Sequence, residues 1–319
     1  MSNEHRTAAE WTVTPSARAD IYQRITDQIV AALEAGSAAG GWRMPWHAST
    51  AGDGSSARPV NAATNTPYRG VNILALWAAA QAHGYTSPAW GTYRQWRELG
   101  AQVRKGEQAS SIVFWRPLDA AGPNSRDDGA SDQEADDHRR LLARGYAVFN
   151  AAQVEGYAAP PAPVFPQTQR IEHAEAFFAA VGATVVHGGA QACYIPAQDL
   201  IRIPAFAVFQ DALAYYATLA HEMTHWAGHP HRCVRDLSGR FGSEAYAAEE
   251  LVAELGAAFL CAQLHLSAQP RPDHAAYVAS WLRVLRADKR AVFTAAAKAQ
   301  QAANWLTQAA QRSRPVATA

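Results

Sequence analysis

The chain is 319 residues long and 49% hydrophobic, which allows two domains with sizeable cores. Its 28 basic and 28 acidic residues cancel, so net charge identifies no class of partner, and any electrostatic signal must lie in the distribution of charge. Three widely spaced cysteines argue against a disulfide framework, and no apolar run is long enough for a membrane span, so we expect a cytoplasmic protein with no membrane partner.

The first part of the chain, residues 16–157, has the pattern of an α+β domain. Ile21, Ile25, Ile29 (or Val30) and Leu33 recur at helical spacing and predict a helix over 17–35 that ends at Gly36. We expect polar loops at 40–50 and 61–70, helices at 71–83 and 89–99, and strands at 110–116 and 144–150.

Cations and aromatic residues are concentrated between residues 41 and 118. This stretch contains eight Lys/Arg residues but only three acidic ones, and it holds six of the ten tryptophans. Bases stack on such rings and phosphates bind such cations in grooves for single-stranded nucleic acid. Alternatively, the tryptophans belong to the core and the charge excess is modest. The candidate contacts are residues that loops and helix ends would present: Trp42, Arg43, Trp46, Tyr68, Arg69, Tyr93, Arg94 and Trp96.

Two segments divide the chain further. An acidic, polar stretch at 119–140 predicts a disordered surface insertion. A proline-rich linker at 158–166 is expected to separate two distinct cores, so that a second domain spans 167–311. In that domain we expect a helix at 171–181, strands at 184–187 and 192–203 (the latter turning at 197–199), and helical structure at 274–310. An extended peptide could pair with such a strand.

The strongest chemical signal is His221-Glu222-Met223-Thr224-His225, inside a probable helix between Asp211 and Gly228. Because His221 and His225 are four residues apart, both imidazoles leave one face of the helix and can bind one zinc ion. Glu222 is adjacent and is expected to act as the general base on a metal-bound water.

A catalytic zinc site needs a third protein ligand. In a second predicted helix, 243–264, Glu250 and Glu254 share one side among small residues. We assign Glu250 as the third ligand and Glu254 as the carboxylate that orients a ligating histidine, although the two could be exchanged. Glu249 is rotated by about a hundred degrees and is expected to face solvent.

The chain resembles ArdC-type antirestriction proteins of conjugative plasmids over nearly its whole length. The matching blocks are DIYQRITDQIVAALE, NAATNTPYRGVNILAL, KGEQ and YAVFNAAQVEG in the first part, and HEMTHWAGHPHR and DLSGRFGSEAYAAEELVAELGAAFL in the second. The resemblance implies an α+β single-stranded DNA-binding domain followed by a zincin-like metallopeptidase domain. It also supports Glu250 as ligand, because Glu250-Leu-Val-Ala-Glu254 matches the pattern of related zincins.

The function implied by the resemblance is protection of incoming plasmid DNA from host restriction by a single-stranded DNA-binding protein that carries a zinc peptidase site. The alternatives are a DNA-dependent zinc protease that mainly cleaves a host protein, and a zinc enzyme whose first domain binds protein. Tyr246, His229 and His231 remain open as the group that stabilises an oxyanion.

Overall fold

The computed structural model describes residues 15–38, 44, 57–117, 141–158, 166–240, 242–266 and 275–313. The insertion expected at 119–140, most of the proline-rich linker, and Trp42, Arg43 and Trp46 lie outside these residues. None of the described helices is long and apolar enough to cross a membrane.

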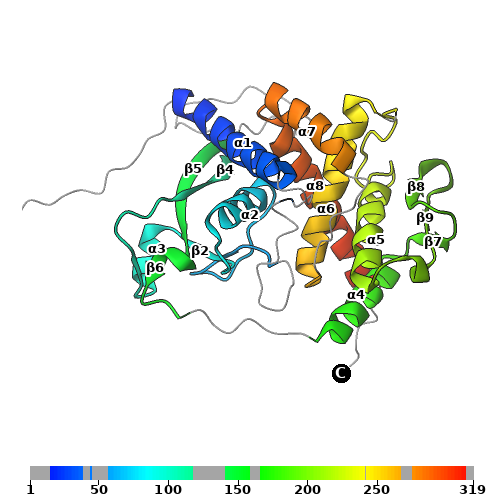
Figure 1. Ribbon diagram of the computed structural model, residues 1–319, viewed down its shortest axis with the longest axis horizontal. Helices are drawn as coiled ribbons and strands as arrows, with labels where there is room; N and C mark the ends of the chain where they lie inside the picture. The colour runs from blue at the N-terminus through cyan, green and yellow to red at the C-terminus, as the bar shows by residue number, and fades with distance from the viewer. Residues whose placement is uncertain are drawn as a thin grey trace, which may run out of the picture.

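The first domain is built from α1 (Pro15–Ala38), β1 (Val60–Asn61), α2 (Val71–His83), β2 (Ala89–Gly91), α3 (Tyr93–Glu98), β3 (Gln102–Val103), β4 (Ser110–Pro117), β5 (Leu141–Asn150) and β6 (Val154–Glu155). Its main sheet has the order β1-β2-β5-β4, with β4 and β5 antiparallel, and β3 pairs with β6 separately. Figure 1 shows α1 and α2 between this sheet and the helices of the second domain.

The predicted stripe on the first helix is confirmed, because Ile21, Ile25, Ile29 and Leu33 of α1 are all buried. The predicted helix at 89–99 is wrong in its first part, where β2 forms instead. Thr92 interrupts the segment, because its side chain accepts a hydrogen bond from Gln95 N and the Gln95 side chain accepts one from Thr92 N. This capping box places the helix start at Tyr93.

The second domain contains α4 (Gln167–Val181), β7 (Thr184–His187), β8 (Cys193–Ile195), β9 (Leu200–Ile203), α5 (Ala212–Ala227), α6 (Glu244–Gln263), α7 (Ala275–Ala287) and α8 (Ala291–Arg312). Its sheet has the order β7-β9-β8, and the predicted turn is present as a short 3-10 helix at Pro196–Gln198 between β8 and β9. The expected helical segment at 274–310 is divided into α7 and α8, because Asp288 Oδ1 accepts a hydrogen bond from Arg290 N between them.

The two domains share one continuous hydrophobic core, so the expectation of two distinct cores is wrong. Tyr22 of α1 packs on Phe293 of α8 with ring centroids 4.6 Å apart, and Trp77 of α2 packs near Phe259 of α6. The linker composition did not show this, because it reports chain flexibility and not which apolar faces the helices present to each other.

Polar contacts also join the domains. The Gln300 side chain in α8 accepts hydrogen bonds from Gly70 N at 3.1 Å and from Arg58 at 3.4 Å. Arg69 donates to Asn304 Oδ1 at 3.0 Å. The 61–70 loop is therefore attached directly to α8, which in turn packs along α6.

Candidate metal centre and nucleic-acid contacts

α5 begins and ends at the residues that the sequence indicates. Asp211 caps its N-terminus by accepting a hydrogen bond from Ala214 N at 2.7 Å, and the N–H of Gly228 bonds to His225 O at its C-terminus. His221 and His225 therefore lie one turn apart on a largely buried helix.

α6 lies close enough to α5 for its carboxylates to reach these histidines. Ser243 caps α6 by accepting a hydrogen bond from Tyr246 N. At Gly256 the two helices nearly touch, because a Cβ atom there would lie 2.4 Å from Thr224 Cγ2. The Thr224 hydroxyl is satisfied within its own helix by donating to Ala220 O at 2.8 Å. A residue without a side chain is thus what allows the close approach.

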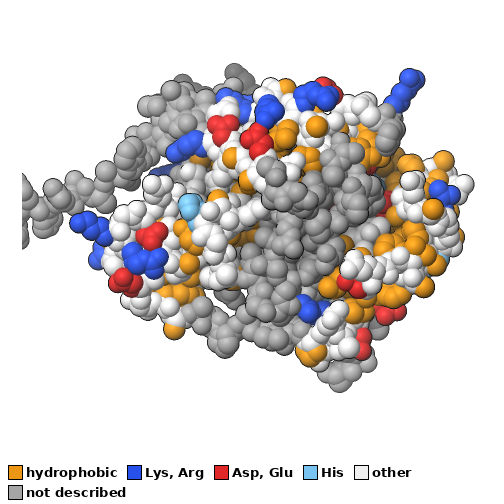
Figure 2. Space-filling model, in the orientation of Figure 1, with side chains coloured by type: hydrophobic (Ala, Val, Ile, Leu, Met, Phe, Trp, Pro, Cys, Tyr) orange, Lys and Arg blue, Asp and Glu red, His pale blue; other side chains and the backbone are white. Residues whose placement is uncertain are grey.

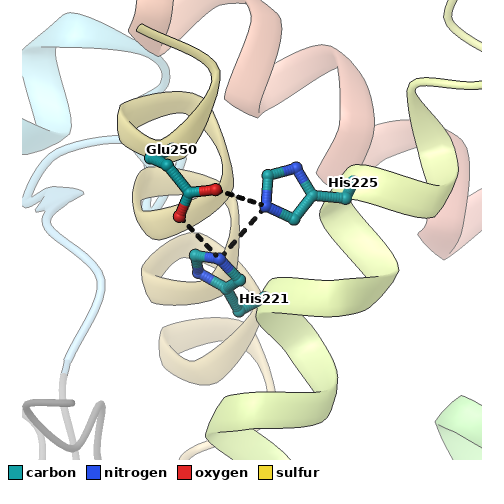
Figure 3. A group of neighbouring side chains, drawn as sticks. All are labelled: His221, His225 and Glu250. Carbon is teal, nitrogen blue, oxygen red and sulfur yellow. Dashed lines mark hydrogen bonds and ion pairs between the residues drawn. The ribbon is translucent and has the colours of Figure 1, made fainter. Parts of the chain in front are cut away.

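His221, His225 and Glu250 converge on one point (Figure 3). The two Nε2 atoms are 3.2 Å apart, and the Glu250 oxygens lie 3.5 Å from His221 Nε2 and 3.4 Å from His225 Nε2. Ligand bonds of about 2.0–2.2 Å put neighbouring atoms of a tetrahedral site roughly 3.3–3.6 Å apart. The three side chains therefore fit one divalent ion and leave a fourth position open.

Two further carboxylates of α6 lie behind the histidines. Glu254 Oε2 is 3.7 Å from His221 Nδ1, on the side expected for an orienting group. Glu249 was expected to face solvent, but it does not. Its Oε1 atom is 3.2 Å from His225 Nδ1, and its side chain is only 13% exposed.

Arg235 explains the position of Glu249. Its Nε and Nη2 atoms donate to the Glu249 carboxylate at 2.9–3.2 Å, and Nη2 also donates to Thr224 O. The guanidinium passes over Gly228, where a Cβ atom would lie 2.9 Å from Arg235 Nη2. The segment after α5 thus covers the side of α6 that helical rotation alone assigned to solvent.

The carboxylates make this a site for positive charge. Burial opposes the charged imidazole, but hydrogen bonds to Glu249 and Glu250 outweigh it and raise the pKa of His225 to about 10. Burial would raise the pKa of Glu250, but the hydrogen bonds from His221 and His225 hold it well below its usual range. A divalent ion would supply the same compensating charge.

The three side chains line a cavity of about 1340 Å³, together with Glu222. Cys193 and Tyr194 of β8 also line it, and β8 pairs only with β9 among the described strands, which leaves one of its edges unpaired. Tyr246 lines the cavity as well, whereas His229 and His231 are not among the described lining residues. Burial raises the pKa of the Tyr246 phenol, so it remains protonated.

The structure separates the predicted nucleic-acid contacts into two groups. Tyr68 and Trp96 are buried, and the Trp96 indole donates to Phe149 O at 3.1 Å, so neither ring can stack on a base. Those two assignments are wrong, because long-range packing encloses both rings. Tyr93, Arg94 and Arg69 remain exposed, although Arg94 pairs with Glu98 and Arg69 bonds to Asn304.

The geometry described above agrees with comparisons to known proteins. Residues 19–149 match the N-terminal domain of anti-restriction factor ArdC, and residues 172–298 match a zincin-like metallopeptidase domain. An uncharacterised protein, y4eC of Sinorhizobium fredii, is 55% identical over 299 residues, covering 92% of this chain and 93% of its own. A DNA primase, TraC of Escherichia coli, is 37% identical over 88% of this chain but only 26% of its own length.

Crystal structures of the antirestriction protein ArdC from plasmid R388 have the same fold. The metal-free form is 40% identical with a TM-score of 0.71, covering 92% of this chain and 98% of its own. The Mn(II)-bound form is 38% identical with a TM-score of 0.70, covering 91% of this chain and 97% of its own. With both domains matched in order and the two folds aligned over nearly their full lengths, the chain belongs to the ArdC antirestriction family.

Proposed function

We propose that this protein binds single-stranded DNA and protects incoming plasmid DNA from host restriction, and that it carries a zinc metallopeptidase site. The observation that supports this most directly is the likeness to R388 ArdC, which covers both domains at 40% identity. A coat of protein on the entering strand would deny a restriction enzyme its duplex substrate.

Zinc is the proposed ion because two imidazoles and one carboxylate, with one position open, are the ligand set of catalytic zinc sites. R388 ArdC has been crystallised with Mn(II), which supports a divalent ion in such a site. When bound, zinc lowers the pKa of its water and polarises a carbonyl. Glu222, a buried carboxylate in the same cavity, would accept a proton there, and the Tyr246 phenol would donate a hydrogen bond to an oxyanion.

A second candidate is a DNA-dependent zinc protease whose main role is cleavage of a host protein. The observation that favours it is the unpaired edge of β8 beside the histidines. An extended peptide could pair with that edge through main-chain hydrogen bonds and pass over the metal centre.

Transfer of an unmodified plasmid into a restricting recipient tests both candidates. Wild-type protein should increase recovery of the plasmid relative to an empty control, and lack of any increase would contradict the proposal. The comparison that separates the candidates is Glu222→Gln, which keeps size and polarity but removes the base. Full protection by this variant would favour the shield, whereas lost protection with unchanged DNA affinity would favour the protease.

A further inference from the structure

The β4–β5 hairpin exposes aromatic side chains that no part of the metal centre uses. Phe114 on β4 is 50% exposed and Tyr146 on β5 is 38% exposed. Arg144 of β5 lies directly opposite Phe114, two residues before Tyr146, and is also exposed. We call these three residues the Phe114–Tyr146 patch.

The strand register places the whole patch on one face of the sheet. Phe114 pairs directly with Arg144, and Ile112 pairs directly with Tyr146. Because side chains alternate between faces, residues two apart on either strand point the same way. Ile112 and Val148 lie on this same face and are fully buried. The exposed rings therefore lie on strands whose neighbouring side chains are held in the core.

The three side chains contact one another. The rings of Phe114 and Tyr146 meet edge to face, with centroids 5.4 Å apart and planes at 89°. The guanidinium carbon of Arg144 lies over the Tyr146 ring, 5.4 Å from its centroid. Aromatic rings perpendicular to each other with an arginine alongside provide both a stacking surface and a cation.

The two strands of the hairpin carry charge of one sign, whereas residues 119–140, which join them, are acidic. Residues 110–117 and 141–150 include Arg116 and Arg144 but no Asp or Glu. At the corner of the domain formed by α3 and the residues that follow it, the cations are paired with carboxylates: Arg94 pairs with Glu98, and Arg104 pairs with Glu107. Figure 2 shows cationic and acidic side chains intermixed over that α3 corner. The two strands thus combine exposed rings with basic residues and have no carboxylate of their own.

We propose that the Phe114–Tyr146 patch is a base-stacking platform for single-stranded DNA, with Arg144 contacting a phosphate. The proposal rests on the proposed function and assigns a place to its DNA contact. Stacking requires unpaired bases, since the faces of bases in a duplex are already covered by their neighbours. Arg144 beside the exposed rings, on strands without carboxylates, favours a polyanion over an apolar protein surface.

Binding of a fluorescent oligothymidylate to the full-length protein tests this inference. The double variant Phe114→Ala/Tyr146→Ala should lose about tenfold or more in affinity, because each stacked base contributes substantially. Arg144→Gln should weaken binding less and reduce the slope of log affinity against log salt by about 0.7. Phe206→Ala and Arg240→Gln remove an exposed ring and an exposed cation from the other domain and should leave affinity unchanged.

All these residues are exposed, so melting temperatures should stay close to that of the wild type. A folded double variant that binds oligothymidylate as tightly as the wild type would show that DNA does not bind at the Phe114–Tyr146 patch, and the proposal of DNA binding itself would stand. Wild-type protein that binds no oligonucleotide would instead remove the proposed function and this inference together.

Photo-crosslinking identifies the contact directly. An oligonucleotide that carries 5-iodouracil should crosslink to peptides containing Phe114 or Tyr146, and an excess of unlabelled oligothymidylate should suppress the product. Crosslinks confined to other peptides would contradict the platform. Capture of an apolar peptide by the patch, with DNA affinity unchanged in the double variant, would identify it as a protein-binding surface instead.

Discussion

At the metal centre, one helix supplies three glutamates with different contacts. Glu250 faces both Nε2 atoms, while Glu254 and Glu249 lie beside the Nδ1 atoms of His221 and His225. A carboxylate on the outer nitrogen fixes the tautomer, so that Nε2 presents its lone pair to the ion. The ligand and its orienting groups are therefore distinguishable by mutation.

We predict one bound zinc per chain, measured by elemental analysis of the purified protein. His225→Ala and Glu250→Ala should abolish stoichiometric binding, because each removes a ligand. Glu254→Ala should retain the ion but with affinity about 10–100-fold lower, because only the orientation of His221 is lost. The opposite ranking of the two glutamate variants would show that the ligand assignment is reversed.

Arg235 gives a second prediction at the scale of single residues. Its side chain is almost fully buried against Glu249, so Arg235→Met should lower the free energy of unfolding, by at most about 3–5 kcal/mol, because the buried carboxylate keeps only His225 as a cationic partner. Urea denaturation of the metal-free protein measures this. Adding Glu249→Gln in the same chain should restore part of the loss, and equal stability of the single and double variants would argue against the ion pair as the cause.

At the scale of elements, the distance between α5 and α6 decides whether a site forms. Periodicity and capping signals were enough to predict both helices, because those signals are local. The contact between the helices depends on Gly256 facing Thr224, and no local pattern indicates which residue a glycine will meet. The 89–99 segment shows the same limit, since its first three residues pair with β1 and β5 as strand β2 and the helix begins only after the capping Thr92.

Gly256→Ala should therefore destabilise the protein, although alanine normally stabilises a helix interior by roughly 0.5–1 kcal/mol relative to glycine. The added Cβ atom would overlap Thr224 Cγ2 and force the helices apart, with an expected cost of about 1–3 kcal/mol and weaker metal binding. Thermal unfolding and metal titration measure the two effects. Thr224→Ala in the same chain removes the two nearest atoms, Cγ2 and Oγ1, and leaves only Cβ at 3.1 Å, so it should recover most of both effects. Failure to do so would locate the strain elsewhere.

At the scale of the whole molecule, short motifs were enough to predict residues of the metal centre. The sequence did not predict which side chains would be buried by distant segments. His221, Glu222 and His225 were found from spacing alone. Trp96 was misassigned because Phe149 and Tyr157, more than fifty residues later, enclose its ring. The exposed face of the β4–β5 hairpin was missed because its rings come from two segments that only pairing brings together, although alternation in each strand was a usable signal.

The shared core leads to a last prediction, that the two domains unfold together. Tyr22, Trp77 and the 61–70 loop all pack or bond onto α6 and α8, so loosening either domain exposes apolar surface of the other. Calorimetry should show one transition, and zinc at a hundredfold excess over its dissociation constant should stabilise that whole transition by about 2.7 kcal/mol. Glu250→Gln should show the same single transition without the zinc response.

Two transitions, of which zinc moves only one, would mean that the domains are energetically separate despite their common core. Hydrogen exchange gives an independent measurement. If the domains unfold together, zinc should slow global exchange at α2, although α2 lies in the other domain from the zinc ligands.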